Sequence, residues 1–232
     1  MRQFNQNIAA REEREKEDDK LLLGLQYMVG DGVQKNYQKG VKIFRELAEK
    51  GNIRGQYSLG VAYERGEGVA QNYEEAVKWY RKSAQQGNVD AGKTLGILYS
   101  TGRGVVKNHD EAVKWYKKAA INGDQFSMYS LGFLYSMGFG VPQSYKESGY
   151  WYNKAISDNT NPELSSAARE QLILNEESIK LENSKKKAKF NSVLLEAFEK
   201  KQDKELQQAP LIKTPSRTYC YRIGNAMTCT DR

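Results

Sequence analysis

The sequence predicts an all-α fold, an α-solenoid of four tandem 36-residue helix–loop–helix repeats. Three features predict it, because a Leu-Gly pair, a Gly-x-Gly-Val run and a large apolar pair each recur every 36 residues in one register. Self-similarity with a period of roughly 20 to 50 residues is typical of solenoids. The matching positions are Leu23-Gly24, Leu59-Gly60, Leu95-Gly96 and Leu131-Gly132; Gly30-x-Gly32-Val33, Gly66-x-Gly68-Val69, Gly102-x-Gly104-Val105 and Gly138-x-Gly140-Val141; and Ile43-Phe44, Trp79-Tyr80, Trp115-Tyr116 and Trp151-Tyr152.

The first helix of each pair is expected at 55–65 in the second repeat. Leu59 and Tyr63 are four residues apart, so they share one helix face. Gly60 lies beside them without a side chain and allows a neighbouring helix to approach closely. Gly66 ends the helix, because a glycine adopts the left-handed conformation common at this position without strain.

The second helix is expected at 73–86. Asn72 with Glu75 forms a capping box, in which each side chain satisfies a free backbone donor. Its buried stripe is expected to contain Ala76, Trp79 or Tyr80, and Ala84. The capping pair recurs as Asn108 with Glu111 and as Ser144 with Glu147, whereas Asn36 is followed by Lys39.

Stacking explains why the repeats come as an array, since a single helix pair cannot bury both of its apolar faces. The terminal copies should therefore differ from the central ones, and they do. Ile43-Phe44 replaces Trp-Tyr in the first copy, and Ile156 and Asn159 replace Ala and Gly in the fourth.

The chain divides into five predicted segments. These are a polar N-terminal segment at 1–18, the four-repeat solenoid at 19–160, capping and charged helices at 161–208, a Pro-containing linker at 209–217, and a β-hairpin tail at 218–232. Asn161-Pro162 reads as a helix start, since Pro suits the first helical turn. The formal net charge is +7, and the basic excess lies after residue 179, so the repeats themselves are close to neutral.

A hairpin turn is expected at Gly224-Asn225. This turn places Cys220 opposite Cys229 as a non-hydrogen-bonded pair, with Cα atoms about 4.5 Å apart. That separation suits a disulfide, so we expect Cys220 and Cys229 to be bonded to each other.

The N-terminal sequence and the cysteine pair point to different cellular compartments. The polar N-terminus has no apolar run of the kind that a signal peptide carries, which indicates a cytoplasmic protein. Disulfides persist mainly outside the cytosol. Either the true start lies upstream and the protein is periplasmic or secreted, or the cysteine pair is reduced in a cytosolic protein. No stretch approaches the roughly 20 apolar residues that a membrane-spanning helix needs.

The motif formed by these residues, with Gly66-x-Gly68-Val69 and Trp79-Tyr80 as its most specific part, resembles that of the Sel-one-like repeat (SLR) family of tetratricopeptide-like solenoids. The resemblance implies a right-handed superhelix, a first helix of each pair that lines the concave face, and a role as an adaptor or scaffold, often in bacteria. The family has no shared catalytic residues. Some cysteine-rich members are linked to β-lactam handling, but the repeats of this chain contain no Cys.

Few residues invite a catalytic interpretation. The single His109 aligns with Tyr37, Tyr73 and Tyr145, so an aromatic position at a helix start explains it. The Gly-x-Gly pairs lack the preceding strand and the following Lys-Ser/Thr of a phosphate loop. One His and two distant Cys do not make a tetrahedral metal site. We therefore expect no enzyme activity, no cofactor and no metal.

Binding residues are sought where the copies differ from one another. Two sets of equivalent positions lie on one stripe of the first helices and are predicted to bind a protein or peptide: Tyr57, Lys93 and Tyr129, and Glu64, Ser100 and Ser136. Tyr-rich polar surfaces suit protein recognition. The expected function is a protein-interaction scaffold. The alternatives are a β-lactam-binding or hydrolysing enzyme, and a binder of anionic surfaces through the basic run at 185–189; nucleic acid is not an expected partner.

Overall fold

The computed structural model describes the backbone of residues 2–208, 218–223 and 226–231, and the side chains of residues 6, 8, 9 and 11–196. This part of the chain holds nine helices and two strands. They are α1 (Arg2–Val29), α2 (Tyr37–Glu49), α3 (Ile53–Arg65), α4 (Tyr73–Gln85), α5 (Val89–Thr101), α6 (His109–Ile121), α7 (Gln125–Met137), α8 (Tyr145–Asp158), α9 (Pro162–Gln208), β1 (Thr218–Ile223) and β2 (Ala226–Asp231). Two compact units divide the chain at Glu176, and each is described by itself.

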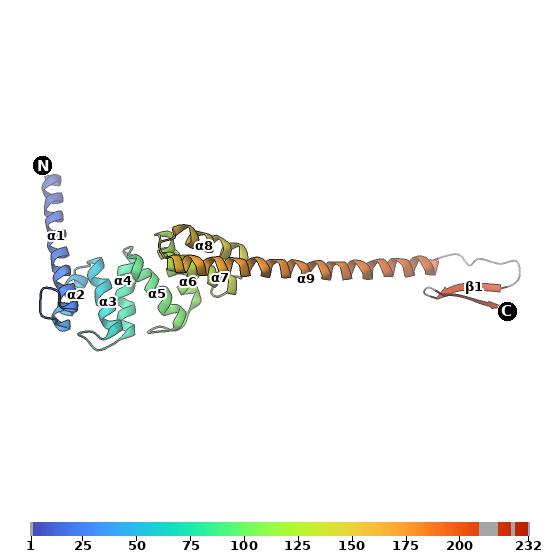
Figure 1. Ribbon diagram of the computed structural model, residues 1–232, viewed down its shortest axis with the longest axis horizontal. Coiled ribbons are helices and arrows are strands. Elements are labelled where there is room, and N and C mark those ends of the chain that lie inside the picture. The colour runs from blue at the N-terminus through green and yellow to red at the C-terminus, as the bar shows by residue number, and fades with distance from the viewer. Residues whose placement is uncertain (1, 209–217, 224–225, 232) are drawn as a thin grey trace. The chain divides into compact units, whose positions relative to one another are not determined.

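The first unit contains the repeats, which follow one another as helix pairs (Figure 1). The pairs are α3 with α4, α5 with α6, and α7 with α8, while the C-terminal part of α1 pairs with α2. The expected helices at 55–65 and 73–86 are confirmed as α3 and α4. We call the contacts between successive pairs the first, second and third junctions, counted from the N-terminus.

Within each pair, a helical glycine receives the ring of an aromatic residue. A Cβ atom added at Gly60 would lie 2.8 Å from the Tyr80 ring, and one at Gly96 would lie 2.5 Å from the Tyr116 ring. Such distances are shorter than carbon atoms tolerate, so only glycine lets the two helices approach this closely. Of the two aromatic candidates for the predicted stripe, Tyr80 is the more buried, since it is 1% exposed and Trp79 is half-buried.

The helix ends follow the sequence signals, with one correction. Gly66 has φ of 72° and ends α3 as the expected left-handed residue. The Asn72 side chain accepts a hydrogen bond from the backbone N–H of Glu75, as expected. The reciprocal half of the capping box is absent, because the N–H of Asn72 donates to the Tyr63 carbonyl at 2.9 Å, and Glu75 instead pairs with Lys78.

The second glycine of each loop lies against the preceding repeat. A Cβ atom at Gly104 would lie 2.5 Å from the backbone of Tyr73, where α4 begins. Gly32, in the first repeat, has the same φ of 69° but no neighbour within 4 Å. The loop glycine is therefore both a turn residue and a contact between repeats, except where no repeat precedes it.

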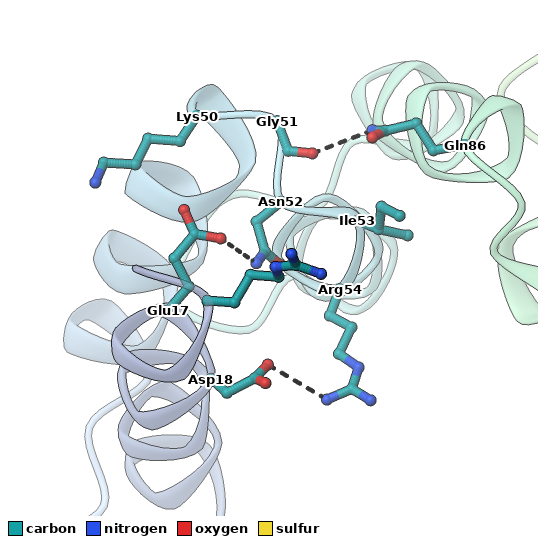
Figure 2. A pocket seen from close by; sticks show the side chains of 9 residues that line it. Glu17, Asp18, Lys50, Gly51, Asn52, Ile53, Arg54 and Gln86 are labelled. Atoms are coloured by element: carbon teal, nitrogen blue, oxygen red, sulfur yellow. Dashed lines mark hydrogen bonds and ion pairs between the residues drawn. The ribbon is translucent and has the colours of Figure 1, made fainter. Parts of the chain in front are cut away.

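From Arg2 onward, the predicted polar segment is helical and continues into the first repeat as part of α1. Figure 2 shows two of the contacts that join it to the start of α3, together with the bond between Gln86 and Gly51. The contacts are Lys50 to Glu13 at 3.4 Å, Asn52 to Glu17 at 2.8 Å, and Arg54 to Asp18 at 3.5 Å. They hold the C-terminal part of this segment against the second repeat.

The beginning of α9 covers the last repeat. Ala168 and Ser165 are fully buried there. Gln125 on α7 donates to the Ala155 carbonyl at 2.6 Å and accepts from the backbone N–H of Asn161 at 2.7 Å. These contacts tie α7, α8 and α9 together at the C-terminal end of the array.

The second unit comprises the rest of α9 and the two strands. The strands pair antiparallel with Cys220 opposite Cys229, the register expected from a two-residue turn. The turn residues Gly224-Asn225, the linker at 209–217 and the cysteine side chains lie outside the described residues. The disulfide stays a prediction.

Candidate protein-binding junctions

Two cavities lie at equivalent places in the array. The first-junction pocket, of about 550 Å³, is lined by Leu25, Met28, Val29, Lys35, Tyr37, Phe44, Tyr57, Ser58, Val61, Arg65 and Glu67. The third-junction pocket, of about 530 Å³, is lined by Ser100, Lys107, His109, Tyr116, Phe126, Tyr129, Ser130, Phe133, Leu134 and Phe139. Most residues of one lining have an equivalent in the other, two repeats along the chain, for example Lys35 and Lys107, or Tyr57 and Tyr129.

The third-junction pocket is predominantly aromatic. The His109 ring stacks on Phe139 with centroids 5.1 Å apart, and Phe133 meets Phe139 edge-on at 6.3 Å. Phe133 is 41% exposed and Phe139 is 39% exposed. Large apolar rings that stay open to solvent in one cluster are typical of interaction sites.

The first-junction pocket combines an apolar floor with charged residues. Phe44 is buried there, and Val29 is exposed. The Lys35 ammonium lies 4.6 Å from the centre of the Tyr37 ring. Arg65 and Glu67 complete the charged part of the lining.

The second junction has internal polar partners at the same positions. The Tyr80 hydroxyl donates to the Glu64 carboxylate at 2.6 Å, and burial, then this hydrogen bond, raises the pKa of Tyr80. The Lys93 ammonium lies 2.8 Å from Asp90 and 3.4 Å from Asp124. Burial alone would lower the pKa of Lys93, but these two carboxylates outweigh it and the net shift is upward.

One position in the loop between the two helices of each pair holds lysine and glutamine in alternate repeats. Gln71 donates to the Glu64 carbonyl at 2.8 Å and to the Tyr73 hydroxyl at 3.2 Å. Gln143, two repeats later, donates to the Ser136 carbonyl at 2.7 Å. Lysine occupies the same position in the two copies that line the pockets, at 35 and 107.

The six residues predicted to bind do not form one continuous surface. Tyr57 lines the first-junction pocket, and Tyr129 and Ser100 line the third. Glu64 and Lys93 are engaged by the internal partners described above. Ser136 is 8% exposed and donates to the Phe133 carbonyl, so its expected exposure is wrong.

Tyr57 and Tyr129 are also packing residues. Their rings lie 5.6 Å from those of Tyr80 and Tyr152, respectively. Burial, followed by the nearby charge of Asp90, raises the pKa of Tyr57. Each of these two tyrosines therefore belongs partly to the core of its repeat and partly to a pocket wall.

The phenylalanines of the third junction were not among the residues predicted to bind. Their signal was present as departures between copies: Phe133 replaces Val61 and Ile97, and Phe139 replaces Glu67 and Arg103. The copies with a charged residue at the position of Phe139 pack without an aromatic ring there, so the repeat itself does not require one. Such a change therefore indicates a feature particular to one junction.

A third cavity, of about 390 Å³, lies between α1 and the α2–α3 loop. Its polar groups pair mainly with one another, as Glu17 does with Asn52, and Gln86 with Gly51 (Figure 2). This cavity therefore belongs to the attachment of α1. Among the described residues, no group of three or more His, Cys, Asp or Glu is placed to hold a metal ion. No helix in the described part of the chain is both long and apolar enough to span a membrane.

The chain matches the Sel1 repeat family model at residues 21–52, 53–88, 95–124 and 125–159, which is more than half of its length. A protective antigen of uropathogenic Escherichia coli strains, which displays an SLR fold, is 37% identical with a TM-score of 0.60, over 62% of this chain and 31% of that one. A Sel1 repeat protein from Oxalobacter formigenes is 34% identical with a TM-score of 0.62, over 65% of this chain and 62% of that one. The chain thus spans less than two thirds of either structure. Comparison with curated proteins gives no match. The four-fold repeat, the helix pairs and this match agree, and the chain belongs to the Sel1 repeat family.

Proposed function

We propose that this chain is a non-catalytic protein-interaction scaffold that binds a segment of a partner protein in the first-junction and third-junction pockets. The observation that carries the proposal is the exposed cluster of Phe133 and Phe139 beside Tyr129 in a cavity of about 530 Å³. Family membership supports it, since Sel1 solenoids generally act as interaction scaffolds.

The chemistry of the pockets favours side-chain recognition. Aromatic residues are enriched among the residues that contribute most to protein interfaces, particularly where a pocket excludes water. A ring of the partner that enters the third-junction pocket would contact Phe133, Phe139 and the half-buried Tyr129. Burying an apolar side chain fully contributes roughly 1.5 to 3 kcal/mol, enough for a single side chain to act as an anchor.

The test is partner capture by the full chain, followed by substitution in the third junction. Phe133→Ala with Phe139→Ser removes the exposed rings, and we expect capture to fall at least tenfold. Thermal stability should change little, since these rings lie outside the buried core. Tyr57 and Tyr129 are less suitable because both pack on buried tyrosines, so their removal would also destabilise the fold.

The matched control is Ile121→Ala, which removes an apolar side chain that is 76% exposed and lies outside both pockets. Capture that survives the double Phe variant contradicts the proposal. If the remaining capture also disappears at high salt and on replacement of the lysines in 185–189, binding is electrostatic and resides in the basic region.

A further inference from the structure

We propose that the first-junction and third-junction pockets together bind one extended acidic peptide segment that carries two large apolar side chains, one for each pocket. This inference rests on the proposed function and specifies its partner. The structural basis is the repetition of one apolar pocket at alternate junctions, each with a lysine at the same place on its lining.

The two pockets share their apolar framework. Tyr57 and Tyr129 are equivalent, as are Phe44 and Tyr116, and Val61 and Phe133. Each pocket therefore offers a tyrosine wall, an aromatic floor, and an apolar side chain from the next repeat. Because the two pockets are alike, we expect each to bind a large apolar side chain of the same peptide.

Each pocket carries a net positive charge in its lining. Neither Lys35 nor Lys107 has a carboxylate within ion-pair distance among the described residues. Among the described residues, Lys107 is the only Lys, Arg, Asp or Glu that lines the third-junction pocket, and Lys35 and Arg65 outnumber Glu67 in the first. An Asp or Glu beside each apolar anchor would complement these ammonium groups.

The second junction separates the two sites and already satisfies its own groups. Lys93 pairs with Asp90 and Asp124, and Gln71 donates inward to a carbonyl. Neither group is left to select a charged or apolar side chain. The peptide therefore crosses this junction with small or polar residues.

The geometry of the array sets the spacing of the anchors. The two pockets are two repeats apart, and neighbouring packed helices are separated by about 8 to 10 Å. The first helices of successive repeats are neighbours, because α1 and α3 line one pocket and α5 and α7 line the other. Two steps between first helices make roughly 20 Å, which an extended chain covers in about six residues at its rise per residue. The anchors of the peptide should therefore lie about six residues apart.

The experiment uses the full chain and the fluorescent peptide Asp-Phe-Glu-Ser-Ser-Gly-Asp-Phe-Glu, with binding followed by fluorescence polarisation. We expect saturable binding that weakens about tenfold or more when either Phe becomes Ala. Shortening the spacer to two residues, or replacing every acidic residue with Lys, should weaken it similarly.

The protein variants locate each part of the peptide. Phe133→Ala and Lys107→Gln should each weaken binding of this peptide, and Lys35→Gln should do so at the other end. Lys42→Gln is the matched control, because it removes the same charge from an exposed helical position that lines neither pocket.

Each outcome decides between the two proposals. If the affinity is unchanged when the second Phe is replaced or the spacer is shortened, the two-anchor inference is wrong. If the Lys-containing peptide binds as tightly as the acidic one, the charge assignment is wrong. If the peptide does not bind but the double Phe variant still loses a captured protein, the inference fails and the proposed function stands. If neither peptide nor protein depends on the pockets, both fail.

Discussion

The second and third junctions share a backbone and differ in what their side chains contact. At the second, Glu64 accepts the Tyr80 hydroxyl and Lys93 pairs with two aspartates. At the third, the equivalent residues are Ser100 and Tyr129, and both line a cavity. The same fold thus produces a closed junction or an open one, according to a few positions.

This difference separates two classes of position in the repeat. The helical glycines, the loop glycines and the aromatic residue opposite them recur in every copy because the helices cannot stack without them. The positions at 64, 71 and 93, with their equivalents, vary because stacking does not depend on them. Substitutions at the two classes should have clearly different effects.

The largest effect is expected at the loop glycines. Gly104→Ala would place a Cβ atom 2.5 Å from the Tyr73 backbone and also strain a positive φ. We expect a loss of about 2 to 4 kcal/mol in the free energy of unfolding, from strain and overpacking together. Gly32→Ala has the same φ without the neighbour, so it should cost only about 1 kcal/mol. Equal losses in urea unfolding would show that the loop contact does not hold the repeats together.

Two helical glycines of the third repeat should respond in opposite ways to replacement by alanine, one variant losing stability and the other gaining it. Gly96→Ala would push a Cβ atom into the Tyr116 ring and should cost about 1 to 3 kcal/mol. Gly92→Ala meets its nearest neighbour at 3.6 Å, an ordinary contact. It should stabilise by about 0.5 to 1 kcal/mol, because alanine favours helix. Thermal melts of the two variants should therefore move in opposite directions.

The alternating loop position tests the difference between closed and open junctions directly. Gln71→Ala removes hydrogen bonds to the Glu64 carbonyl and the Tyr73 hydroxyl, which should cost about 1 kcal/mol. Lys107→Ala should change stability by less than about 0.5 kcal/mol. A comparable loss from the two changes, measured by urea unfolding, would mean that both junctions are closed alike.

The smallest effect is a loss of stability in alkali. Burial raises the pKa of Tyr152 to about 12. Its stabilising contribution is therefore complete below the ordinary tyrosine pKa of about 10 and is lost as the pH rises from there through about 12. Between pH 8 and pH 10 Tyr152 alone should account for a loss of about 0.4 kcal/mol. Tyr152→Phe should remove this share and leave the shares of the other tyrosines with raised pKa values, such as Tyr57 and Tyr80. Identical urea-unfolding profiles for both proteins across this range would contradict the shift.

Much of the fold could be predicted because its signals are local. Gly66, Asn72 and the 36-residue period fix where helices begin and end through backbone conformation and capping alone. The N-caps of the first helices follow the same chemistry, as when the Asn88 side chain accepts from the Ala91 N–H, although only the caps of the second helices were predicted. Local rules were therefore sufficient for the helix pairs.

The pockets were harder to predict because they depend on contacts between repeats. Helical periodicity placed Glu64 and Ser136 on one stripe, but it did not show that Tyr80 reaches Glu64 or that Ser136 is buried. Phe139 lies in a loop, outside any helical stripe, and joins the cluster through its ring contacts with His109 and Phe133. Side-chain partners on separate helices decide which positions of a stripe remain open.

The first turns of α9 set the length of the array. Asn161 caps this helix by accepting from the Leu164 N–H at 3.1 Å, about where a fifth repeat would begin. Small residues, Ser165 and Ala168, are buried against the fourth repeat at this place. The helix thus acts as a cap, because its first turns occupy the surface of the fourth repeat on which another helix pair would stack. A helix pair added at this end could stack on the fourth repeat only if these first turns were displaced, because they already bury the surface it would use.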